Sequence, residues 1–199
     1  MNKLSRRAGA ILSVSVMSLA AGCMTSTVKA PVEWSVECTA EVAVSRAKPR
    51  HGVAKLTLVE MRAPYAVREV AVLRADGSVA FDPCNSYAAA PVQLMKGVAA
   101  ESLAACGLFE SVVSSGSSVD ADVEVEVVVK RLALDCRQEG SRRAVAELFV
   151  RLVRSHRIVA EAPGAGAADA AKGDYAAAFS EAATTAFADA LKRLSNGTP

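Results

Sequence analysis

Five cysteines are the residues of this chain whose chemistry depends most on their position. Cys23 directly follows the segment Leu-Ala-Ala-Gly at residues 19–22, and small residues at the end of an apolar run mark a cleavage site. Three basic residues, Lys3, Arg6 and Arg7, precede that run, which is shorter than the roughly 20 apolar residues that span a bilayer. We therefore predict a signal peptide over residues 1–22 and acyl chains on Cys23. The alternative is an ordinary signal peptide in which Cys23 is incidental.

Acyl chains on Cys23 predict a location as well as a modification. Two or three acyl chains attach a protein to a membrane far more firmly than one chain does. Met24 follows Cys23, in place of the aspartate that retains many such proteins in the inner membrane. We therefore expect the chain to be lipid-anchored in the outer membrane and to face the periplasm, with inner-membrane anchoring as the alternative. Residues 23–32 are predicted to be the lipidated N-terminus and a tether.

The other four cysteines, Cys38, Cys84, Cys106 and Cys136, are candidates for disulfides, because an even set in an oxidising compartment is typical of paired cysteines. Cys106 falls on the apolar stripe of a predicted helix, and Cys136 is in phase with the apolar residues of a predicted strand. We therefore predict a disulfide between Cys106 and Cys136, which leaves Cys38 to pair with Cys84. The alternative is that Cys106 is a buried free thiol.

No other constellation in the sequence predicts catalysis or a cofactor. Metal binding is not expected, because the only histidines are His51 and His156 and neither a CxxC nor an HxxxH spacing occurs. The nucleophile motif Gly-x-Ser-x-Gly and the phosphate-binding Gly-x-x-x-x-Gly-Lys-Ser/Thr loop are also absent from the sequence. Glu124 and Glu126 are interpreted as the solvent face of a strand. We therefore expect a protein that is not an enzyme.

Charge argues against one class of partner. The chain has 23 basic and 21 acidic residues, and removal of residues 1–22 takes away three basic and no acidic residues. The mature chain therefore has a formal charge of −1 and no basic block. Nucleic-acid binding depends on clustered Lys and Arg, so we expect no nucleic-acid partner.

Apolar periodicity predicts the elements that position these residues. Alternation typical of strands occurs at residues 34–44, 52–60, 65–73 and 79–81, and Asp76-Gly77 between the last two predicts a hairpin. A helix is predicted over residues 91–106, with Pro91 at its start and Gly107 after its end.

The second half of the chain predicts four more strands and a second helix. The strands are expected at residues 108–113, 120–136, 144–153 and 157–161. The apolar phase of residues 120–136 shifts between Val129 and Arg131, which predicts a bulge. The segment 164–169 is poor in large side chains, so we expect a flexible loop there. A helix is predicted from Asp174, its N-cap, to Leu194.

This order of elements predicts one α+β domain over residues 33–195 with a short tail at 196–199. Strands that follow one another through short loops favour an antiparallel meander. Two amphipathic helices are available to cover one face of that sheet. The expected architecture is therefore a two-layer domain.

Four short segments resemble the family of PqiC-like ABC-type transport auxiliary lipoproteins. They are LVEMRAPY at 58–65, VLR at 72–74, YAAAP at 87–91 and GLFESV at 107–112. The long strand near residues 121–134 and the last helix also stand where this family has similar elements. Two departures are Tyr87, where many members have tryptophan, and residues 33–50, which match poorly. We interpret Tyr87, Pro91 and Phe109 as helix-start and core residues.

The resemblance implies a function without chemistry of its own. It implies an auxiliary or adaptor component of an MCE-type system, in which an ABC permease and ATPase and an MCE-domain protein move lipid between the inner and outer membranes. A homo-oligomer is compatible with this role. The alternative hypothesis is an envelope-structural or secretion-associated lipoprotein that uses the same module for assembly.

Overall fold

The computed structural model describes residues 30–39, 49–170 and 173–197, so the predicted signal peptide and Cys23 lie outside the described residues. Eight strands and two helices follow one another in the described part of the chain: β1 (Val32–Trp34), β2 (His51–Met61), β3 (Glu69–Leu73), β4 (Val79–Tyr87), α1 (Pro91–Ala105), β5 (Phe109–Ser114), β6 (Val123–Asp135), β7 (Arg143–Arg154), β8 (Arg157–Asp169) and α2 (Tyr175–Gly197).

All eight strands form one mixed sheet around β6. One edge of β6 pairs with β7 along its whole length, and β7 pairs with β8, both antiparallel. The other edge is shared by two strands that run parallel to β6: β2 along Val123–Val129, and β3 at Leu134 and Asp135. β5 pairs with β2, β4 with β3 and β1 with β4.

The expectation of an antiparallel meander is therefore wrong, although the mixed α/β character of the domain is confirmed. Only β3–β4 and β6–β7–β8 are joined as antiparallel neighbours. Alternation of apolar residues specifies which face of a strand is buried, but it carries no information about the direction of the neighbouring strand. The sequence pattern could not show that β2 and β3 lie one after the other along the same edge of β6.

Both helices pack against the same face of the sheet, which we call the inner face. α1 contacts β2 and β5, α2 contacts β7 and β8, and the two helices contact each other. The predicted bulge in β6 is confirmed by a register shift between Val129 and Arg131. Val129 is fully buried on the inner face, and after the bulge Leu132 is again in that core. The bulge therefore keeps both apolar phases of this strand in one core.

The segment 164–169 is not a flexible loop but the second half of β8. Its glycines lie directly beneath α2, where a Cβ added to Gly166 would stand 2.0 Å from the carbonyl oxygen of Ala182, and one added to Gly164 equally close to that of Ala186. Ala182, Ala183 and Ala186 are themselves fully buried. Small residues on both elements therefore let the helix backbone approach the strand backbone closely, which the composition alone had hidden.

Other predictions for the ends of elements are confirmed or corrected at single residues. Asp174 is the N-cap of α2, because its carboxylate accepts the N–H of Ala177 at 3.1 Å. The Asp76-Gly77 hairpin is confirmed between β3 and β4, and Gly77 has a φ of 82° that favours glycine. Of the strand predicted over residues 34–44, Trp34 lies in β1 and residues 35–39 lie outside any strand, whereas residues 40–44 are outside the described residues. α2 extends to Gly197, so it includes part of the predicted tail.

We predict that Gly166→Ala lowers the free energy of unfolding by about 2–3 kcal/mol, because the added Cβ must push α2 away from β8. The measurement is urea denaturation followed by circular dichroism. Gly97→Ala is the matched control: Gly97 lies within α1 with no atom in the way of a Cβ, so this change is expected to stabilise the protein by up to about 1 kcal/mol. Equal stability of the Gly166→Ala protein and the unchanged protein would contradict the close approach.

Candidate functional site

The segment that leads from the predicted lipid anchor into the domain is held in the helical layer. We call residues 34–39 the strap. Its first residue, Trp34, packs its ring against Tyr87, Phe179 and Tyr175, with ring centroids 4.7, 5.1 and 6.3 Å away. Val36 is buried with Trp34 in the main core. The strap is therefore an integral part of the domain.

Hydroxyl groups on the two helices bind the strap. The N–H of Glu37 donates to Ser180 Oγ at 3.0 Å, and the N–H of Thr39 donates to Thr184 Oγ1 at 3.1 Å. Residues 37 and 39 of an extended chain are separated by about 6.6 Å, and residues 180 and 184 of a helix by about 6 Å. The two spacings match, so hydroxyl groups one helical turn apart on α2 accept hydrogen bonds from every second amide of the strap. From α1, Ser102 Oγ lies 3.7 Å from Cys38 Sγ.

Polar residues on the apolar faces of the two helices are the sequence feature that indicates the strap. Ser102, Ser180 and Thr184 are buried polar side chains within otherwise apolar helix faces. Buried hydroxyls require partners.

The residues singled out in the family resemblance are buried, which confirms their interpretation as helix-start and core residues. Tyr87 is 1% exposed and Phe109 is 6% exposed, and Pro91 is buried at the start of α1. Burial raises the pKa of the Tyr87 hydroxyl far above its ordinary value. These residues are core residues in the structure, and Tyr87 in particular supports the strap.

Neither predicted disulfide is formed among the described cysteines. Cys106 lies just before Phe109, which pairs with the start of β2, whereas Cys136 follows the end of β6 and donates its N–H to Leu73. The starts of β2 and β6 are aligned, so the two thiols are separated by about the 40 Å length of β6, far beyond disulfide geometry. The Cys106–Cys136 prediction is therefore wrong in this structure.

Each of these cysteines has a distinct environment. Cys106 is fully buried, donates to the carbonyl of Leu103 at 3.0 Å, and has a pKa raised by desolvation, which agrees with the alternative of a buried thiol. Cys136 is half-buried, and its pKa is also raised by desolvation. Cys84 is exposed on β4, and Cys38 lies within the strap. β1 runs parallel to β4, and its first residue, Val32, pairs with Asn85. Cys84 therefore lies level with the start of β1, whereas Cys38 follows the end of β1.

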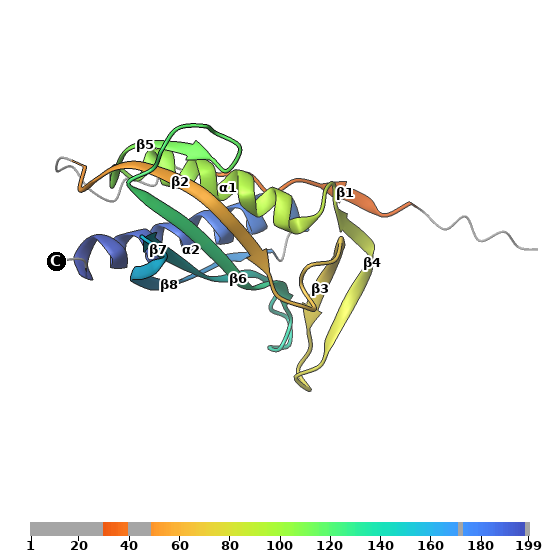
Figure 1. The fold of residues 1–199 in the computed structure, drawn as a ribbon. Helices are drawn as coiled ribbons and strands as arrows, with labels where there is room; N and C mark the ends of the chain where they lie inside the picture. Colours follow the sequence, from red (N-terminus) through yellow and green to blue (C-terminus); the bar gives the residue numbers. More distant parts are fainter. Residues whose placement is uncertain (1–29, 40–48, 171–172, 198–199) are drawn as a thin grey trace, which may run out of the picture.

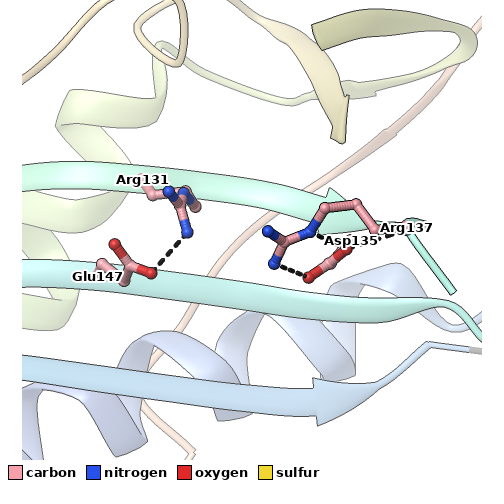
Figure 2. A network of polar contacts seen from close by, with 4 residues as sticks. All are labelled: Arg131, Asp135, Arg137 and Glu147. Atoms are coloured by element: carbon pink, nitrogen blue, oxygen red, sulfur yellow. Dashed lines mark hydrogen bonds and ion pairs between the residues drawn. The ribbon is translucent and has the colours of Figure 1, made fainter. Parts of the chain in front are cut away.

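The face of the sheet opposite the helices, the outer face, carries a polar network near the β6–β7 turn (Figure 2). The side chain of Arg137 pairs with Asp135 at 2.6 Å, and that of Arg131 pairs with Glu147 at 2.6 Å. The hydrogen bonds from Arg137 hold the pKa of Asp135 below its ordinary value. Both pairs are partly exposed, and such pairs contribute about 0–1 kcal/mol to stability. The network therefore consists of two partly solvated surface ion pairs.

Five of the eight large apolar residues that the structure exposes in the described part of the chain lie at two opposite ends of the sheet; the other three are Val32, Leu58 and Val67. We name these the Val123 end and the Asp135 end, after the two ends of β6. The tip of the β7–β8 hairpin, at the Val123 end, exposes Ile158 and Val159. The β3–β4 hairpin, at the Asp135 end, exposes Val79 and Phe81. This arrangement offers two surfaces for contact at the ends of the sheet, with Leu58 of β2 exposed between them.

The histidines do not form a site. His51 lies beside Phe109, and its pKa is lowered by desolvation and by the positive charges of Arg154 and Arg50. His156 occupies the β7–β8 turn with a φ of 61°. Within residues 30–39, 49–170 and 173–197, no three His, Cys, Asp or Glu side chains are grouped so that they could hold a metal ion. In the same part of the chain, neither helix has the length and apolarity needed to cross a bilayer.

Known proteins resemble this chain in structure and not in sequence. Neither a protein-family model nor a curated protein matches it. The crystal structure of protein XCC0632 from Xanthomonas campestris, assigned to the family DUF330, is 17% identical with a TM-score of 0.65, covering 82% of this chain and 94% of that one. An uncharacterised protein is 11% identical with a TM-score of 0.50, covering 81% and 98%. These two matches show a shared fold.

PelC from Paraburkholderia phytofirmans, whose crystals contain a dodecamer, is 16% identical with a TM-score of 0.42. The match covers 77% of this chain and 93% of PelC.

We predict that Ser180→Ala combined with Thr184→Val loosens the strap, because two amides in part-buried hydrogen bonds lose their acceptors. Each lost partner is expected to cost about 1 kcal/mol. Hydrogen exchange should become faster at Glu37 and Thr39 before it changes in β6. Thr185→Val, the same replacement at the next and exposed position of α2, should leave both amides protected. Unchanged exchange in the double variant would refute the hydroxyl contacts.

Proposed function

We propose that the chain is a lipoprotein, cleaved before Cys23 and held in the outer membrane by acyl chains, that serves as a non-catalytic auxiliary or adaptor component of an MCE-type ABC lipid-transport system. The observation that supports this proposal most is that the predicted attachment point and an exposed apolar surface lie on different parts of the domain. The predicted anchor leads into the strap near one end of the sheet, and exposed apolar side chains lie at the other end. An adaptor requires this separation between its attachment and its partner surface.

The strap supports the attachment half of the proposal. Pro31 lies eight residues after Cys23, and even a fully extended chain spans at most about 28 Å between the two. Beyond Pro31 the chain is fixed by β1 and by the burial of Trp34. A domain linked in this way stays close to the membrane that holds its lipid.

The β7–β8 hairpin supports the partner half. Ile158 is 57% exposed and Val159 is 49% exposed, and Val119 in the loop before β6 is also exposed at this end. Arg154 joins that loop to the hairpin by donating to the carbonyl of Asp122 at 3.2 Å. Apolar side chains at an ordered hairpin tip are suited to contact with a protein partner. We assign the contact with an MCE-domain protein or the ABC permease to this end.

Replacement of the anchor residue tests the attachment. We expect Cys23→Ser to yield an uncleaved or soluble periplasmic protein, because no thiol remains for the acyl chains. The measurements are membrane fractionation and the mass of the N-terminal peptide. Cys84→Ser, at an exposed cysteine of β4, is the matched control and should remain processed and membrane-bound. A Cys23→Ser protein that is still processed and membrane-bound would overturn the lipoprotein assignment.

Co-purification from detergent-solubilised envelopes tests the partner. The unchanged protein should bring down an MCE-domain protein, and genes for an ABC permease, an ATPase and an MCE-domain protein should lie beside its gene. Ile158→Asp combined with Val159→Asp should reduce this capture at least about tenfold, as expected when about 1.4 kcal/mol of binding free energy is lost. Asp in place of Val67, an exposed valine in the loop before β3, should have little effect. Capture of envelope-structural or secretion proteins in place of an MCE-domain protein would favour the alternative hypothesis.

A further inference from the structure

The β3–β4 hairpin carries apolar side chains on the outer face. Phe81 lies opposite Ala71, and Val79 lies opposite Leu73. Ala71 and Leu73 are buried with Ala133 of β6 in a small cluster separate from the main core. Phe81 and Val79 therefore extend this cluster to the margin of the sheet, where they are 45% and 37% exposed. We call these two residues and the turn 74–78 the hairpin tip.

A second hairpin extends from the same end of the sheet. β3 pairs with the last residues of β6, and Leu73 accepts the N–H of Cys136. The turn of β3–β4 and the turn of β6–β7 therefore extend side by side beyond the Asp135 end, as Figure 1 shows.

The start of β1 is the part of that strand nearest the hairpin tip. β1 is parallel to β4, and Val32 pairs with Asn85, so Val32 is closer along β4 to Val79 than Trp34 is. Pro31 shares a groove with Asp82 and Pro83 of β4. From Pro83 to Val79 is four residues, about 13 Å along a strand. The eight residues from Pro31 to Cys23 reach at most about 28 Å, so a bilayer that holds the Cys23 lipid lies within reach of the hairpin tip.

Arginines flank this end of the molecule. Residues 136–143 contain three arginines and one glutamate. Arg137 is paired with Asp135, whereas the Arg142 side chain donates to the Tyr175 hydroxyl at 3.3 Å. Neither Arg142 nor Arg143 forms an ion pair within the described residues. Arg74 adds a further positive charge at the hairpin tip, beside Asp76. Each basic residue close to an anionic membrane surface contributes about 1 kcal/mol of attraction.

We propose that the Asp135 end docks on the surface of the membrane that holds Cys23, with Phe81 and Val79 at the boundary between headgroups and acyl chains and with Arg142 and Arg143 facing anionic headgroups. This inference rests on the acyl anchor of the proposed function. It adds an orientation: the sheet stands with the Asp135 end on the membrane and with Ile158 and Val159 pointing away from it. The anchor supplies attachment, and the hairpin tip determines which surface faces the lipid.

The test uses the full lipidated chain in vesicles of phosphatidylcholine and phosphatidylglycerol whose acyl chains are brominated, since bromine quenches a nearby indole. Tryptophan is placed at the tip in Phe81→Trp and at the opposite end in Ile158→Trp; both positions are exposed, and the only native tryptophan, Trp34, is buried. We expect the fluorescence of Phe81→Trp to fall about twofold, because an interfacial ring is buried about 5–10 Å into the boundary region. Ile158→Trp should be unaffected. Vesicles without phosphatidylglycerol should reduce the quenching.

Vesicle flotation of the same samples separates the two levels of the proposal. Protein that floats while Phe81→Trp is not quenched leaves the anchor intact and overturns the docking. Equal quenching of Phe81→Trp and Ile158→Trp also overturns it, because the domain then has no preferred orientation. Protein that does not float overturns the anchor and the docking together. Quenching of Phe81→Trp that does not depend on phosphatidylglycerol overturns the role of the arginines.

Discussion

The closeness of α2 to β8 is the constraint on which the rest of the domain depends. Gly164 and Gly166 bring the backbone of the strand against alanines of the helix, with no room for a further carbon atom. A helix at this distance buries its small residues completely, although alanine offers little apolar surface by itself. The same close packing places Ser180 and Thr184 of α2 next to the strap. The chain thus uses small residues to compensate for its few aromatic side chains.

The strap follows from that geometry and connects the fold with the proposed role. An extended segment in the helical layer must satisfy its backbone amides, because the burial of Trp34 and Val36 beside them removes part of their access to water. Ser180 and Thr184 satisfy two of these amides from α2. The segment that follows the predicted lipid anchor in the sequence is therefore bonded to the longer helix of the domain. Orientation toward a membrane and orientation toward a partner become properties of one rigid unit.

How far the sequence could predict this molecule depends on what its patterns encode. The alternation in β6, the bulge after Val129 and the Asp174 cap are local, and each was predicted correctly. Strand direction depends on pairing partners, so the parallel pairs of β2 and β3 with β6 could not be derived from alternation. The segment 164–169 was predicted to be a loop because it has few large side chains. Its small residues are instead required by the close packing of α2, which follows later in the chain. The apolar periodicity places Cys106 and Cys136 on the buried sides of their elements. It does not show how far apart they lie along the length of the sheet.

The strap also determines how the molecule responds to force. In the proposed lipid-anchored form, a pull on Cys23 reaches the domain through β1. The strap continues the chain directly after β1 and contacts both helices. The load is therefore applied in shear, so the aromatic contacts of Trp34 and the amide–hydroxyl bonds resist together and do not open one after another from an end. A membrane that bends or moves against a fixed partner would strain the tether before it unfolds the domain. The same few contacts that complete the core therefore act as a mechanical clamp between the lipid and the protein.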